Sequence, residues 1–186
     1  QQADYDIAVT LDEKTQRIYG EETITYFNNS PQPLHYLWLQ LDQNVRAQDS
    51  WTQQTATGEI SDTVFFRLLQ RIHSDYDGGF KIEHVKDSNG RDLSYSVVNT
   101  MMRIDMPETL EPGSKVSFQI KYWYNINDQA KVGGRSGFHY FEQDDNYLFA
   151  IAQFFPRLTV YDDSLGWQHT QFLGSGEFTL PFGQYR

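Results

Sequence analysis

The sequence has no cysteine, few basic residues and no long apolar run, and each absence excludes a class of function. Without thiols the chain cannot form a disulfide, a thiolate zinc site, an iron–sulfur cluster or a cysteine nucleophile. Its 186 residues carry 15 Lys and Arg against 25 Asp and Glu, a net charge of −10. This balance argues against binding of nucleic acid or of an anionic membrane surface. No stretch approaches the roughly 20 apolar residues that a membrane-spanning helix needs.

The familiar catalytic motifs are absent as well. The five histidines include no HExxH pair, and the chain has no GxSxG elbow, phosphate-binding loop or dinucleotide fingerprint. Asp75 begins a segment that resembles a calcium loop, but Phe80 and Lys86 stand where that loop needs glycine and glutamate. Adjacent carboxylates such as Glu21 and Glu22 would point to opposite faces of a strand, so we expect them to be solvated charges. The sequence therefore predicts no catalytic residue and no metal ligand in this chain.

The pattern that is present has a period of two, which is typical of half-buried β-strands. Tyr5–Leu11 alternates apolar and polar side chains, and Arg17–Asn28 alternates again through Ile18, Glu22, Ile24 and Tyr26. Further strands follow at roughly ten-residue intervals with turn residues between them. We therefore predict an all-β fold, an antiparallel β-sandwich or curled sheet, with at most one or two short helices. The one helix-like segment is Asp62–His73, and residues 1–186 are expected to form a single domain.

Three local expectations can be tested against the structure. Leu34–Leu41 is apolar on both faces, which predicts a central strand with Trp38 buried. Phe80–Lys86 and Leu93–Val98 flank an Asn-Gly turn, which predicts that they pair as a hairpin. Met101–Met106 is predicted to be a short strand that ends in a loop from Pro107 to Gly113.

Aromatic residues are abundant, with 4 tryptophans, 12 tyrosines and 13 phenylalanines. In a β-sandwich most rings at alternating positions fill the core. Some of them could instead form a platform on which a sugar stacks, and the sequence leaves both interpretations open.

Several segments resemble, in order and spacing, the opening of zinc metallo-aminopeptidases of the aminopeptidase N and leukotriene hydrolase family. These are the run from Gly20 to Tyr26, then Asn28-Asn29-Ser30-Pro31, then Leu37 to Asn44, and later Leu110-Glu111-Pro112-Gly113. The most specific segment is Gln153-Phe154-Phe155-Pro156-Arg157-Leu158-Thr159-Val160-Tyr161-Asp162-Asp163, followed by Gly166-Trp167. The resemblance spans essentially the whole chain.

The resemblance implies that the chain is the saddle-shaped N-terminal β-domain of a larger zinc aminopeptidase. Zinc and the catalytic residues would belong to a thermolysin-like domain of the same polypeptide, which this sequence does not contain. Such a β-domain caps the active-site cleft, and it lends a Gln or Glu that helps to hold the peptide's amino terminus. Gln153 is the matching position here, so it is the expected substrate-binding residue. The chain alone is expected to be inactive and to hold no cofactor.

Two alternative functions remain open. The runner-up is a stand-alone β-sandwich binding module for carbohydrate or protein, and a small stand-alone hydrolase is a weaker third. A domain removed from its neighbour should expose a large apolar patch, whereas a binding module should show an aromatic platform with polar neighbours. The resemblance favours export to the periplasm or cell envelope over a cytoplasmic location, but the sequence itself leaves the compartment unknown.

Overall fold

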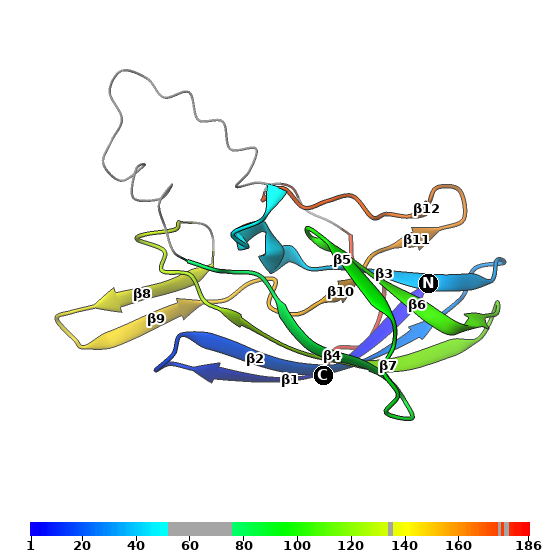
Figure 1. Cartoon of the computed structure of the whole chain (residues 1–186), viewed down its shortest axis with the longest axis horizontal. Coiled ribbons are helices and arrows are strands. Elements are labelled where there is room, and N and C mark those ends of the chain that lie inside the picture. Colours follow the sequence, from blue (N-terminus) through cyan, green and yellow to red (C-terminus); the bar gives the residue numbers. More distant parts are fainter. Residues whose placement is uncertain (52–75, 134–135, 175, 177–178) are drawn as a thin grey trace, which may run out of the picture.

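The computed structural model describes residues 1–51, 76–133, 136–174, 176 and 179–186, and these residues form mainly antiparallel β-structure (Figure 1). The strands are β1 (Gln2–Asp12), β2 (Arg17–Phe27), β3 (Leu34–Gln40), β4 (Lys81–Asp87), β5 (Tyr95–Val98), β6 (Met101–Leu110), β7 (Lys115–Asn125), β8 (Gly137–Phe141), β9 (Asn146–Ala150), β10 (Arg157–Leu158), β11 (Tyr161–Asp162) and β12 (Gly166–Trp167). A short 3-10 helix, η1, covers Asp42–Arg46. Within these residues the prediction of an antiparallel β-fold with little helix is confirmed. The predicted helix Asp62–His73 lies outside the described residues.

Two four-stranded sheets make up most of the fold. The first sheet has the order β1-β2-β7-β4 and the second has the order β10-β3-β6-β5. One buried apolar cluster joins them, with Ile24 and Phe118 from the first sheet and Leu37 and Ile104 from the second. These side chains fall at every second position of their strands, as the period-two pattern requires. Two hairpins, β8-β9 and β11-β12, lie outside the four-stranded sheets.

The end of the described chain adds a parallel segment to the first sheet. The amides of Ala3, Tyr5 and Ile7 in β1 donate to the carbonyl oxygens of Phe182, Gln184 and Arg186, at 2.8 to 2.9 Å. The bridge of Gln2 with Phe182 and that of Tyr5 with Tyr185 are both parallel. The paired strands are all antiparallel within the described residues, as predicted, and this edge adds a short parallel segment.

The expected long hairpin around Asn89 and Gly90 is wrong beyond its turn. The turn itself is present: Gly90 adopts a φ of 78°, and the amide of Leu93 donates to the Val85 carbonyl. Past that point the two strands separate, and β4 pairs with β7 while β5 pairs with β6. The Asn-Gly sequence therefore predicts where the chain reverses direction. The partners of β4 and β5 depend instead on burial of the apolar faces of both sheets.

The strand β6 is longer than the sequence predicts. It runs to Leu110, so it includes Pro107 and most of the expected loop. The register between β3 and β6 shifts between Leu34 and Tyr36, and Pro107 lies in the stretch of β6 facing this irregularity. A β-bulge tolerates proline because the ladder hydrogen bonds are already interrupted there.

The prediction that Trp38 is buried is also wrong. Trp38 is half-buried, while its neighbours Leu37 and Leu39 are completely buried. Adjacent residues of a strand point to opposite faces, so Trp38 lies on the outer face of β3. The ring of His169 covers it in a stacked arrangement, with ring centroids 5.1 Å apart.

Candidate functional site

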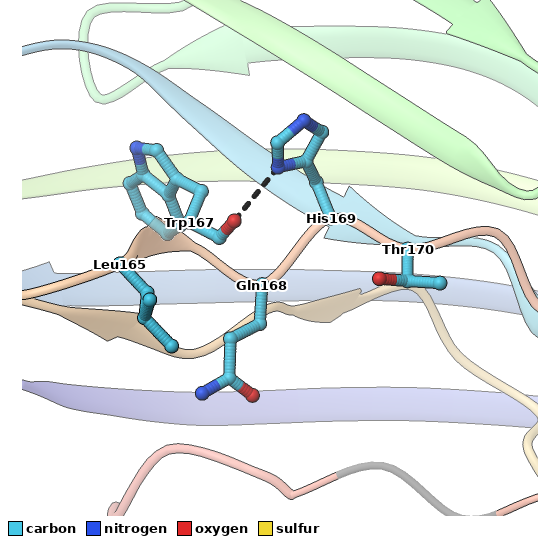
Figure 2. Close-up of a pocket in the computed structure, with 5 residues that line it drawn as sticks. All are labelled: Leu165, Trp167, Gln168, His169 and Thr170. Carbon is cyan, nitrogen blue, oxygen red and sulfur yellow. Dashed lines mark hydrogen bonds between the residues drawn. The ribbon is translucent and has the colours of Figure 1, made fainter.

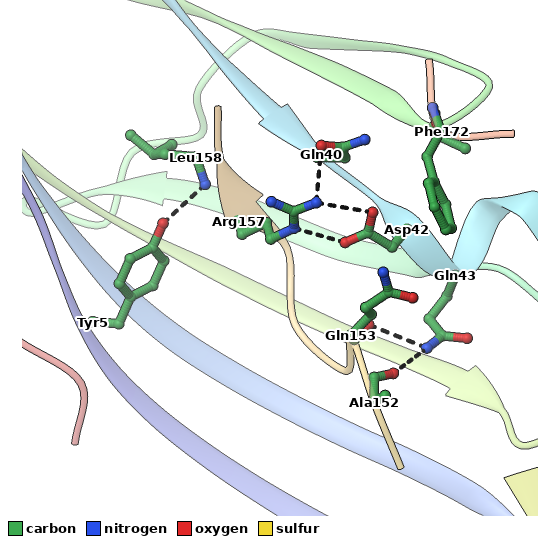
Figure 3. Close-up of polar contacts among 10 residues, drawn as sticks. Tyr5, Gln40, Asp42, Gln43, Ala152, Gln153, Arg157, Leu158 and Phe172 are labelled. Atoms are coloured by element: carbon green, nitrogen blue, oxygen red, sulfur yellow. Dashed lines mark hydrogen bonds and ion pairs between the residues drawn. The ribbon is translucent and has the colours of Figure 1, made fainter. Parts of the chain in front are cut away.

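Gln153, the substrate-binding residue expected from the resemblance, lies in the turn between β9 and β10. Its side chain is exposed, and its φ of 54° is in the left-handed region that residues other than glycine seldom adopt. Gln43 of η1 holds this turn, because its Nε2 donates to the carbonyl oxygens of Ala152 at 2.7 Å and of Gln153 at 3.1 Å (Figure 3). The backbone that carries Gln153 is therefore fixed while its amide stays accessible.

A buried ion pair anchors the other end of the same segment. Arg157 Nε donates to Asp42 Oδ2 at 2.7 Å, and Arg157 Nη2 donates to Asp42 Oδ1 at 3.2 Å. The same Nη2 also donates to Gln40 Oε1 at 3.0 Å (Figure 3). The side chains of Arg157 and Asp42 are only 8% and 0% exposed. Two parallel hydrogen bonds fix both the distance and the orientation of the guanidinium, so β10 is held firmly beside β3.

Tyr5 connects this segment to the first sheet. The amide of Leu158 donates to the Tyr5 hydroxyl at 2.9 Å (Figure 3). Burial raises the pKa of Tyr5 far above its ordinary value, so the hydroxyl stays neutral at all physiological pH values. The segment from Gln153 to Leu158 is thus attached to η1, to β3 and to β1.

Asp42, Gln43 and Asn44 belong to one of the segments that carry the resemblance, but the sequence predicts no role for them. In the structure Asn44 Oδ1 accepts from the amide of Phe80 at 2.8 Å, and Asn44 Nδ2 donates to the Asn99 carbonyl at 2.8 Å. All three side chains therefore hold segments that are distant in sequence. No periodicity could have revealed this, because the segments that they hold lie between 36 and 115 residues away.

A surface hollow of about 470 Å³ lies in the C-terminal third of the chain (Figure 2). It is lined by Leu165, Trp167, Gln168, His169 and Thr170. The carbonyl oxygen of Trp167 can only accept, so the 2.7 Å contact with His169 means that Nδ1 carries a proton and donates. The hollow is built from one short segment, and it does not include Gln153.

A carboxyl group lies buried in the first sheet. Glu22 in β2 is 1% exposed, and neither of its carboxyl oxygens has a hydrogen-bond partner in the described part of the chain. Burial raises the pKa of Glu22 well above its ordinary value of 4.5. The prediction of a solvated charge is therefore wrong for Glu22, although it holds for Glu21 on the exposed face.

Within the described residues, no three His, Asp or Glu side chains converge to hold a metal ion. These residues therefore do not fit a zinc site, and zinc chemistry would require ligands outside them. In the same ranges no helix is long and apolar enough to cross a membrane.

The fold is similar to part of several solved zinc peptidases. One is an M1 zinc metallopeptidase from Deinococcus radiodurans, with 14% identity, 68% of this chain and 20% of that chain covered, and a TM-score of 0.39. A mutant from the same organism, bound to a Tyr-Ser-Ala substrate, matches at 13% identity with the same coverage and TM-score. A two-domain M1 zinc metallopeptidase mutant bound to L-arginine matches at 15% identity over 75% of this chain and 23% of that chain, with a TM-score of 0.40.

These values show a distant fold resemblance to part of M1 metallopeptidases and carry no information about activity. The chain spans about a fifth of the length of the structures it matches. No family model matches the sequence. No curated protein matches it either.

Proposed function

We propose that this chain is the non-catalytic N-terminal β-domain of a zinc aminopeptidase. In that enzyme the domain would cap the active-site cleft and help to hold the amino terminus of a peptide. The proposal rests on the sequence segments described above, above all the one from Gln153 to Asp163. Its partner would be a metal-binding domain of the same polypeptide, which would supply the zinc and the water that attacks the peptide bond.

One observation supports a binding role for Gln153. Its side chain is exposed on a turn whose backbone carbonyls are held by Gln43 and whose far end is anchored by Arg157. A binding residue acts best when its backbone is already fixed, because less conformational entropy is lost when substrate binds. The amide oxygen of Gln153 can accept from an ammonium group, and its amide nitrogen can donate to a carbonyl.

We expect Gln153→Ala to lower kcat/KM of the complete enzyme. The fall should correspond to a loss of about 1–3 kcal/mol of transition-state stabilisation, the contribution of a hydrogen bond to a charged group. The measurement is steady-state hydrolysis of an aminoacyl anilide, with zinc content measured in parallel and expected to stay unchanged. Gln143→Ala is a matched control, because Gln143 is also exposed and lies in the β8–β9 turn. If both variants keep wild-type kinetics, Gln153 does not contact the substrate.

A second experiment tests the domain assignment itself. The purified chain of 186 residues should bind no stoichiometric zinc and should not hydrolyse an aminoacyl anilide. The physical reason is that a catalytic zinc needs about three protein ligands in fixed geometry. Metal analysis and an activity assay of the same preparation check this expectation. One zinc per chain, or turnover that a chelator abolishes, would contradict the proposal.

Exposed apolar side chains give the proposal additional support. Leu165 is 82% exposed and Leu173 is 55% exposed. A neighbouring domain that packs on these side chains would remove them from water. The alternative of a stand-alone binding module is favoured by a different feature, the aromatic residues of the β8–β9 hairpin.

A further inference from the structure

The β8–β9 hairpin gathers four aromatic rings on one face. Phe138 is paired with Phe149 and Tyr140 with Tyr147, and residues two apart in a strand share a face. The rings contact one another in sequence: Phe138 and Tyr147 have centroids 5.7 Å apart, Tyr140 and Tyr147 4.9 Å, and Tyr147 and Phe149 5.8 Å. We call these four residues the aromatic face.

The aromatic face is anchored at one end and open at the other. Phe138 and Phe149 pack against the apolar cluster between the sheets. Tyr140 and Tyr147 lie closer to the hairpin turn and are 45% and 37% exposed. Figure 1 shows the hairpin extending outward from the sheets, with its turn away from them. The cross-strand pairs hold the rings in place, so a ligand would meet a surface that is already ordered.

The turn next to the open end carries only negative charge. Glu142, Asp144 and Asp145 are exposed, and none of them forms an ion pair within the described residues. Residues 136–156 contain no Lys or Arg. The Tyr140 hydroxyl donates to Asp145 Oδ1 at 2.7 Å. That hydrogen bond is the main cause that raises the pKa of Tyr140.

We propose that the aromatic face and the acidic turn together bind an arginine side chain of an extended peptide. A guanidinium is flat, so it stacks on a tyrosine ring, and its N–H groups can donate in pairs to a carboxylate. Each half of this chemistry is present here within one hairpin. A neutral sugar would use the rings but leave three carboxylates uncompensated, so the charge favours a cationic peptide. This inference does not depend on the aminopeptidase proposal.

Fluorescence anisotropy with the chain of 186 residues tests the ligand class. The probes are a labelled Gly/Ser peptide carrying two arginines and the same peptide with two glutamates. We expect the arginine peptide to bind at least about tenfold more tightly, the equivalent of one charge-assisted hydrogen bond. Its affinity should fall as salt is added. Equal binding of the two peptides, or competition by a neutral oligosaccharide that displaces the arginine peptide, would overturn the proposal.

Variants of the hairpin locate the site. Tyr147→Leu keeps an apolar strand residue but removes an exposed ring, and it should weaken binding of the arginine peptide about two- to fivefold. The double change Glu142→Gln with Asp144→Asn should weaken binding and reduce its salt dependence, and it leaves the hydrogen bond of Tyr140 in place. Tyr95→Leu is the control, because Tyr95 is 39% exposed on β5. Loss of affinity in Tyr95→Leu, or wild-type affinity in the hairpin variants, would show that the peptide binds elsewhere or not at all.

Discussion

Replacing Glu22 by methionine should raise the free energy of unfolding by about 1–3 kcal/mol at pH 7, the usual cost of a buried polar group without a partner. Methionine has a similar length and volume, so the core should need little repacking. Glu22 lies on the inner face of the first sheet, between Ile7 of β1 and Ile120 of β7. Chemical denaturation of the two proteins under identical conditions measures the difference.

The same substitution should change how stability depends on pH. Burial raises the pKa of Glu22 in the folded chain above 4.5, so the folded state keeps a proton that the unfolded chain has lost. The contribution of protonated Glu22 to stability is therefore full below pH 4.5, and it falls as the pH rises from there towards the folded-state pKa. The slope in this window is about 1.4 kcal/mol per pH unit for one proton. The facing groups, Tyr5 and Tyr122, have raised pKa values because of burial and stay neutral across it.

Two further variants separate the causes. Glu22→Gln removes the titration but keeps a polar group, so it should flatten the pH dependence with little gain in stability at low pH. Glu21→Gln is the matched control, because Glu21 is exposed on the opposite face and accepts a hydrogen bond from Gln119. Its stability and pH profile should match the parent. If Glu22→Met is less stable than the parent at pH 7, the carboxyl group has a stabilising partner and this interpretation is wrong.

Arg157→Met should destabilise the chain by about 3–5 kcal/mol, because it leaves the carboxylate of Asp42 buried without its partner. Asp42 is completely buried, and Arg157 supplies both of the hydrogen bonds described above. Chemical denaturation again provides the measurement. If the chain belongs to an aminopeptidase, as proposed above, the same change should also impair substrate binding, because the turn at Gln153 would lose its anchor at β10.

A double variant shows whether the loss comes from the unpaired charge. Combining Arg157→Met with Asp42→Leu removes both charges, so it should recover most of the stability. Lys121→Met is the control for an exposed pair, since Lys121 and Glu83 are 45% and 38% exposed. Its effect should not exceed about 1 kcal/mol. A loss of that small size in Arg157→Met would mean that the buried pair is not a structural anchor.

Local pattern was sufficient to predict most strands of the two large sheets. Residues 17 to 27 form β2 because apolar side chains alternate there, and residues 115 to 125 form β7 for the same reason. A strand pattern depends only on neighbours two residues apart, so the sequence carries it directly. The strand β8 is not among the strands named from the sequence. It begins at Gly137, a residue type that is depleted in strands, and its pairing with β9 outweighs that preference.

The candidate site was predictable only in part. The resemblance placed Gln153 in a specific segment, and the structure leaves its amide exposed. The side chains that support it, Gln43 and Arg157, lie in segments that carry the resemblance, but the sequence predicts no role for either. Their partners were hidden because each contact spans more than 100 residues.

The sequence by itself determined the fold class, the acidic charge and the absence of thiol chemistry, because these follow from composition and from a period of two. Only the tertiary structure decided which strands share a sheet, that Glu22 is buried without a hydrogen-bond partner among the described residues, and that Asp42 meets Arg157. The physical reason is that burial and pairing depend on which surfaces come together. A carboxylate at an alternating position looks the same in the sequence whether water or a second sheet covers it.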